Sequence, residues 1–228
     1  MCGRYFLTTG GEGIRQLFGC VNSMAWQPRF NIAPGQTVPM VISQATSRQR
    51  SLQLARWGLI PFWAENEKMG QRLINARAET LMERPAFKAA LRQRRCLIPA
   101  SGFYEWRRTG RGGQPYAIVR QDGGLMAFAG LWESWVQPGA KIPLISCAII
   151  TTEANRAVLP IHRRMPAILE ESQWKYWLDP ETETPQTVLG PCREDLLRLY
   201  PVSRYVNDPR HDDPQCVSPL NRTDSLFD

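Results

Sequence analysis

The sequence predicts a single α+β domain whose core is a curved, barrel-like and mostly antiparallel β-sheet with a few peripheral helices. Strand-like apolar runs outnumber helical patterns, the two do not alternate as in βαβ units, and a Gly-rich turn joins two neighbouring strands. A chain of 228 residues is long enough for one sizeable core. We expect residues 1–206 to form the domain and residues 207–228 a polar, Pro-rich and loosely ordered tail without a catalytic role.

The predicted strands are short apolar runs bounded by turn residues. They cover residues 38–43, 51–58, 95–99, 102–107, 115–120, 125–132 and 145–151. The Gly-rich segment RTGRGGQ joins two of these runs and predicts a β-hairpin. Helical spacing of apolar residues predicts helices over Glu12–Phe18, Arg84–Arg94, Glu170–Leu178 and Arg193–Leu199. Near the N-terminus, the residues RYF predict a further strand that would hold the chain end in place.

The chain is basic, and its positive charge comes almost entirely from arginine. The formal net charge is +7, and 24 of the 28 basic residues are Arg. Because the planar guanidinium of Arg can grip a phosphate with two hydrogen bonds, this composition favours a nucleic-acid partner. A basic surface that only maintains solubility is the alternative.

The sequence argues against a membrane protein and against a metal-dependent one. It has no run of about 18 apolar residues and no apolar signal core at its start, so we expect a cytoplasmic protein. The six cysteines are at least 18 positions apart and only two histidines are present, so we expect no zinc site and no cofactor. Cys96 and Cys147 lie inside apolar runs and are predicted core residues.

Cys2 is the candidate nucleophile. Initiator methionine is normally removed before a small second residue, so the mature chain would begin with Cys2 and a free α-amine. This amine has a pKa of roughly 7.7–8.0 and the thiol one of about 8.5. An aldehyde can form a Schiff base with the amine, after which the thiol can close a thiazolidine ring. Gly3 would allow close approach of a ligand, and Arg4 could hold a phosphate beside the reacting carbon. Alternatively, Cys2 is an accident of an unstructured terminus.

Two further residues have the chemistry of proton carriers. Glu105 lies in SGFYEW, where strand alternation places it on the same face as Phe103. A carboxyl group among aromatics is partly desolvated, which raises its pKa and suits it to the proton transfers of Schiff-base formation. His162, in LPIHRRMP, would carry a proton or bind a sugar oxygen. For Glu105 the alternative is an exposed strand glutamate paired with Arg107 or a neighbour. For His162 it is a capped histidine of the core.

Two other segments are candidates for substrate binding. In LINARAET, Asn75 and Arg77 share one face of a strand, so the amide could position a sugar while the guanidinium binds its phosphate. They could equally mark a simple strand end. In WGLIPFW, Trp57, Phe62 and Trp63 lie near a Pro-containing turn, and exposed aromatics beside Arg clusters stack on unpaired bases. Core packing is the alternative, above all for Trp57.

Seven segments of the chain follow one another in the order typical of a known family. They are MCGRY at the start, RFNIAPGQ at 29–36, WGLIPFW at 57–63, LINARAET at 73–80, SGFYEW at 101–106, IHRRMP at 161–166 and PVSRYVN at 201–207. Over nearly its whole length the chain therefore resembles the SOS-response-associated peptidase (SRAP) domain proteins, also called abasic site processing proteins. One difference is Arg163, because the family often has an acidic residue after this histidine.

The resemblance implies a function in DNA repair and roles in it for individual residues. Cys2 would form a thiazolidine crosslink with the ring-opened sugar of an abasic site in single-stranded DNA, shielding it from strand cleavage. Asn75 would orient the sugar, Glu105 would act as general acid and base in bond formation and reversal, and His162 would assist at the sugar hydroxyl. The residues implied in DNA binding are Arg4, Trp63, Arg77 and Arg164. The resemblance also implies autoproteolytic exposure of Cys2, which is hydrolase chemistry, and it implies lyase-type chemistry as well. We expect a monomer, associated with the nucleoid when bound to DNA.

Two other functions remain open at this point. A thiol peptidase acting on other proteins would use Cys2 as nucleophile and His162 as base. A noncovalent reader of modified DNA bases would bind without Cys2.

Overall fold

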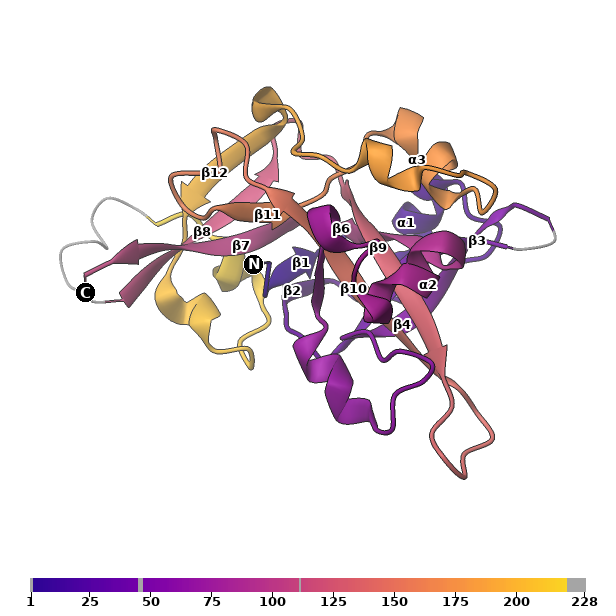
Figure 1. Cartoon of the computed structure of the whole chain (residues 1–228). Helices are drawn as coiled ribbons and strands as arrows, with labels where there is room; N and C mark the ends of the chain where they lie inside the picture. Colours follow the sequence, from indigo (N-terminus) through magenta and orange to yellow (C-terminus); the bar gives the residue numbers. More distant parts are fainter. Residues whose placement is uncertain (1, 45–46, 111, 221–228) are drawn as a thin grey trace.

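The structure, a computed structural model, describes residues 2–44, 47–110 and 112–220 (Figure 1). Its strands form a seven-stranded and a five-stranded sheet. The α-helices lie outside the sheets and span Gly11–Phe18 (α1), Pro85–Gln93 (α2) and Glu171–Leu178 (α3). Short 3-10 helices span Glu67–Arg72 (η1), Ala78–Thr80 (η2), Pro185–Val188 (η3), Glu194–Leu196 (η4), Arg204–Asn207 (η5) and Pro214–Val217 (η6). No helix in the described ranges is long and apolar enough to cross a membrane.

The predicted barrel-like, mostly antiparallel core is confirmed. Its strands are Thr37–Ser43 (β3), Arg50–Trp57 (β4), Arg95–Ala100 (β6), Met126–Trp135 (β9) and Leu144–Glu153 (β10). They pair in the order β10–β4–β3–β6–β9, and β9 also pairs with β10, so the sheet closes on itself. Two short strands extend β10 beyond the barrel: Asn75–Arg77 (β5) runs parallel to it and Arg164–Pro166 (β11) antiparallel.

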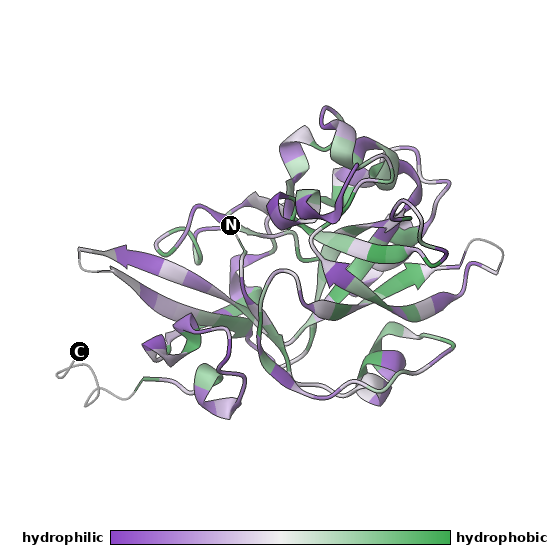
Figure 2. Ribbon diagram, turned by 90° about the horizontal axis from the view of Figure 1, so that it is seen from below, coloured by the Kyte–Doolittle hydropathy of each residue, from purple (hydrophilic) through white to green (hydrophobic). Residues whose placement is uncertain are grey.

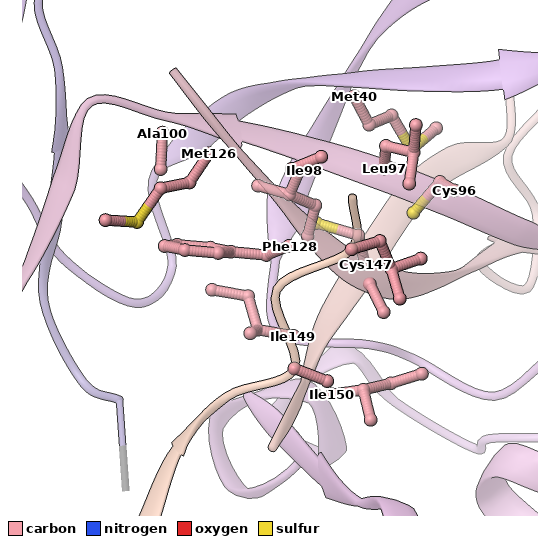
Figure 3. Packing of buried hydrophobic residues seen from close by; sticks show 14 of the residues in the cluster. Met40, Cys96, Leu97, Ile98, Ala100, Met126, Phe128, Cys147, Ile149 and Ile150 are labelled. Carbon is pink, nitrogen blue, oxygen red and sulfur yellow. The ribbon is translucent and has the colours of Figure 1, made fainter. Parts of the chain in front are cut away.

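Apolar side chains from these strands fill the barrel (Figure 3). Met40, Leu97, Phe128 and Ile149 come from β3, β6, β9 and β10 and are all fully buried. Burial of each large apolar side chain stabilises the fold by about 1.5–3 kcal/mol. Cys147 is buried with them, as is Cys96, which confirms both predicted core cysteines.

The second sheet carries the N-terminus and the predicted hairpin. Its strands are Tyr5–Leu7 (β1), Arg29–Ile32 (β2), Gly102–Thr109 (β7), Gly112–Arg120 (β8) and Leu197–Pro201 (β12), in the order β12–β8–β7–β1–β2. The β7–β8 pairing confirms the hairpin and projects away from the barrel (Figure 1). Because β1 pairs with β7 on one side and β2 on the other, the start of the chain is held by two neighbours.

The helices follow local signals in the sequence. Gly19 ends α1 in a left-handed conformation with φ 61°, which glycine adopts at little cost. Pro85 opens α2, where its missing N–H costs no hydrogen bond. Glu170 and Gln173 form a reciprocal capping box at the start of α3. These three predicted helices are confirmed, and each of their ends agrees to within one residue.

The structure corrects two expectations. The predicted helix Arg193–Leu199 is wrong, since the chain forms η4 and then β12, which pairs with β8. The expected loose order from Asn207 onward is also wrong for residues 208–220. There, Asp212 accepts a hydrogen bond from the backbone N–H of Asn31 (2.9 Å), and Cys216 is buried.

Candidate functional site

Cys2 lies just before β1 and is fully buried. Its carbonyl oxygen accepts a hydrogen bond from Asn75 Nδ2 at 2.7 Å. Its thiol donates to the carbonyl oxygen of Arg4 (3.8 Å), which also accepts from the backbone N–H of Tyr104 (3.0 Å). The interpretation of Cys2 as part of an unstructured terminus is therefore wrong.

The surroundings of Cys2 favour the neutral thiol. Burial raises the pKa of this thiol far above its ordinary range, and the carboxyl group of Glu105 raises the pKa further. A thiol with such a pKa keeps its proton at neutral pH. It is thus a poor first nucleophile, because the thiolate is the reactive form.

Glu105 reaches the same place from β7. Its side chain is buried, and Phe103 on the same face belongs to the barrel core. Tyr104 and Trp106 on the other face pack in a separate cluster, so the predicted alternation is confirmed. The alternative of an exposed glutamate is wrong. Burial raises the pKa of Glu105, and the nearby His162 opposes part of this rise. The carboxyl group can therefore hold a proton closer to neutral pH than an exposed one.

His162 lies beside Glu105 and remains partly exposed. Its Nδ1 is 3.7 Å from Glu105 Oε1 and 3.0 Å from both the backbone nitrogen and the carbonyl oxygen of Arg164. Nδ1 can accept from that N–H when it is unprotonated and donate to that carbonyl when it is protonated. The imidazole ring is thus held in place in either protonation state.

Asn75 completes the group. It lies on β5, whose parallel pairing places Asn75 opposite Ile149 of the barrel strand β10. Its Nδ2 holds Cys2, while its Oδ1 is buried and has no hydrogen-bond partner among the described residues. A buried acceptor without a partner costs about 1–3 kcal/mol, which points to a ligand that donates to it. The structure thus brings Cys2, Asn75, Glu105 and His162 together from four separate segments.

A cavity of about 440 Å³ opens beside Asn75. Its lining includes Arg77, Trp63, Arg84 and Phe87. Trp63 is 48% exposed, in the manner of a stacking platform. We call this space the Trp63 cavity.

One aromatic residue of this region belongs to the core, and one lining residue was not predicted. Trp57 is 1% exposed, so core packing is the correct interpretation for it. Arg84 was not predicted as part of the site. The only feature that marks it in the sequence is its place directly before Pro85, at the start of α2.

Arg4 and Arg164 are engaged inside the protein. Arg4 donates to Asn31 Oδ1 (2.7 Å) and to the carbonyl oxygen of Val206 (2.9 Å). Arg164 donates to both carboxylate oxygens of Glu79, at 2.8 and 3.0 Å. Both arginines therefore connect distant segments, and their contact with DNA phosphates stays a prediction.

The described residues offer no evident metal centre. Within residues 2–44, 47–110 and 112–220, no group of three or more His, Cys, Asp or Glu side chains is placed to hold a metal ion. The donor groups of the site are instead a thiol, an amide, a carboxyl group and an imidazole, which suit proton transfer and hydrogen bonding.

Comparison with known proteins assigns the family. The model of the family described as SOS response associated peptidase (SRAP) matches residues 1–209. The chain belongs to the SRAP family. The matched range includes all four residues of the candidate site described above.

Relatives cover nearly the whole SRAP chain. It is 40% identical over 224 residues to "Abasic site processing protein YoqW" of Bacillus subtilis (strain 168), covering 95% of this chain and 99% of that protein. It is 30% identical over 262 residues to "Abasic site processing protein HMCES" of Gallus gallus, covering 96% and 78%. A crystal structure of a protein from Bacteroides thetaiotaomicron superimposes with a TM-score of 0.86 at 24% identity, covering 96% of this chain and 100% of that one, which supports the fold.

Proposed function

We propose that this protein captures abasic sites in single-stranded DNA by forming a thiazolidine through Cys2, once Met1 has been removed. The observation that carries the proposal is the meeting of Cys2 with Asn75, Glu105 and His162 at one place. The abasic site processing activity in the names of its relatives supports the same substrate. We further propose that the chain itself removes Met1 and that the crosslink protects the strand from cleavage.

The bond-forming steps use the groups of the site in sequence. The α-amine nitrogen of Cys2 adds to the aldehyde carbon of the ring-opened sugar. Protonated Glu105 donates its proton to the resulting hydroxyl, which leaves as water and gives a protonated Schiff base. The thiol sulfur then adds to the imine carbon while its proton passes to the Glu105 carboxylate, which closes the neutral five-membered ring and restores the acid. Asn75 Oδ1 accepts a hydrogen bond from the amine or from a sugar hydroxyl.

The raised pKa of the Cys2 thiol favours this order over peptidase chemistry on other proteins. A thiol peptidase needs a thiolate as its first nucleophile, and burial and Glu105 both oppose that form. In the proposed mechanism the amine attacks first, and the thiol reacts only after an electrophilic imine lies beside it.

The Trp63 cavity supports binding of the strand on one side of the lesion. Arg77 and Arg84 would pair with its phosphates, and the exposed indole of Trp63 would stack on an unpaired base. Such contacts position the strand without reading its sequence, as a damage sensor requires.

The test is incubation of the purified protein with single-stranded DNA that contains one abasic site. We expect a protein–DNA adduct that survives denaturation, is absent in Cys2→Ala, and contains a chain without Met1 by mass spectrometry. Cleavage of unrelated peptides without any adduct would support a thiol peptidase. Binding that is unchanged in Cys2→Ala, prefers a modified base and yields no adduct would support a noncovalent reader.

A further inference from the structure

The β7–β8 hairpin has one face that begins at the candidate site and continues into solvent. Side chains of a strand alternate between its two faces, so Glu105 and Arg107 share one face of β7. Tyr116 of β8 lies directly opposite Glu105 in the register and shares this face. We call it the Glu105 face.

Arg107 and Tyr116 form a cation–π contact on the Glu105 face. The guanidinium carbon of Arg107 lies 5.1 Å from the centre of the Tyr116 ring. Arg107 is exposed and Tyr116 is half-buried, so both can meet a partner. A guanidinium stacked on an aromatic ring offers a flat surface to a base and N–H groups to a phosphate.

The opposite face of the hairpin is already covered near the site. Trp106 donates its indole N–H to Asn207 Oδ1 (2.8 Å), and the guanidinium of Arg4 lies 5.9 Å from its ring. Tyr104 packs there in a cluster with Val202 and Val206. A strand bound next to Glu105 can therefore continue along the Glu105 face.

A DNA strand with its abasic site at Cys2 continues in two directions. One flank has the Trp63 cavity, which opens beside Asn75. The other flank has the projecting hairpin, whose outer part is hydrophilic (Figure 2). Arg107 lies two residues beyond Glu105, or roughly 7 Å along the strand, so it is within reach of the adjoining nucleotide.

We propose that Arg107 and Tyr116 on the Glu105 face form a second subsite, which holds the nucleotide flanking the abasic site on the side away from the Trp63 cavity. This proposal rests on the function proposed above. The hairpin is then a binding arm, in which the guanidinium contacts the phosphate and the stacked pair supports the base.

The test measures noncovalent binding of oligonucleotides that carry a stable tetrahydrofuran analogue of the abasic site. The analogue is placed in the centre, at the 5′ end or at the 3′ end of the oligonucleotide. The variants are Arg107→Ala and Tyr116→Ala. Arg108→Ala is the matched control, since it removes the same charge from the next residue of β7, on the opposite face.

With the central lesion we expect Arg107→Ala and Tyr116→Ala each to weaken binding by about tenfold, the loss of one base stack or phosphate contact. With one of the two end-placed lesions, which lacks the nucleotide held by this subsite, both variants should bind like the wild type. Arg108→Ala should bind like the wild type throughout. Melting temperatures of the three variants equal to that of the wild type would show that folding is unaffected.

Two results would overturn the proposal. One is an equal loss in Arg107→Ala and Arg108→Ala, which would indicate general electrostatic attraction. The other is wild-type binding by Arg107→Ala and Tyr116→Ala with every oligonucleotide. If the wild type still crosslinks a true abasic site, only this subsite is refuted; if it forms no adduct, the proposed function itself fails.

Discussion

At the scale of single residues, Glu105 is a buried carboxyl group that acts as the acid in the proposed reaction. Its side chain is 4% exposed, and its carboxyl group lies beside both Cys2 and His162. Glu105→Gln keeps the shape of the side chain but cannot deliver a proton to the leaving hydroxyl. We expect the crosslinking rate constant to fall by about 10²–10⁴-fold, the usual contribution of general acid–base catalysis. Quenched time courses at saturating DNA would measure this, and an unchanged rate constant would remove Glu105 from the mechanism.

The same carboxyl group should make stability depend on pH. Burial raises the pKa of Glu105 in the folded state, while the unfolded chain has the ordinary value of about 4.3. Between these two pKa values the folded protein binds more protons than the unfolded one, so the free energy of unfolding falls as the pH rises. Denaturant unfolding at a series of pH values should show this decline in the wild type beyond that of Glu105→Gln. If the unfolding free energy of the wild type instead rose with pH relative to that of Glu105→Gln, the upward direction of the pKa shift would be contradicted.

The residues of the candidate site were easier to predict from the sequence than the arginines with internal roles. Cys2, Glu105 and His162 were recognisable because each has chemistry that its segment does not otherwise require. The internal roles of Arg4 and Arg164 were not, because their partners Asn31 and Glu79 are far away in sequence. An arginine can bind an internal carboxylate or a phosphate with the same geometry, so its type alone does not distinguish them.

At the scale of elements, helices with end signals were predictable, whereas strands that form only by pairing with a distant edge were not. The segment 193–199 shows the reason, because Leu196, Leu197 and Leu199 fit a helical face and a strand almost equally well. The edge of β8 decides between them by pairing with β12, and that edge is not visible in the local sequence. Likewise, β11 has three residues and exists only because β10 offers a partner.

Arg95 shows how one side chain can fix two elements. It is 4% exposed, and its guanidinium donates to the carbonyl oxygens of Leu91 (2.6 Å) at the end of α2 and Trp177 (2.6 Å) at the end of α3. Arg95→Met would leave these carbonyl groups without their donor. We expect a loss of about 2–4 kcal/mol in unfolding free energy, since removal of one partner exposes a desolvation cost. Arg92→Met, at an exposed position of α2, should change it by less than about 0.5 kcal/mol. Equal stability of the two variants by denaturant unfolding would argue against this role.

At the scale of the whole molecule, the two ends of the described chain support each other. Asn31 on β2 is fully buried and accepts from Arg4, near the start of the chain. Its Nδ2 donates to the carbonyl oxygens of Val206 (3.1 Å), Asp208 (3.0 Å) and His211 (2.7 Å), near the end. Residues 208–211 therefore help to hold the strand that presents Cys2. These contacts account for the order of residues 208–220 despite their polar composition.

The net charge of +7 also acts at this scale, but only charges that touch DNA should affect the salt dependence of binding specifically. Arg77 is exposed in the Trp63 cavity beside Asn75. Loss of one phosphate contact lowers the slope of log K against log salt by about 0.7 for single strands. Arg77→Ala should therefore bind more weakly and with a flatter slope. Arg193→Ala, which removes an equal charge outside this cavity, should keep the wild-type slope. Titrations at several salt concentrations would measure both, and equal slopes in the two variants would show that Arg77 contributes only to the general field of the protein.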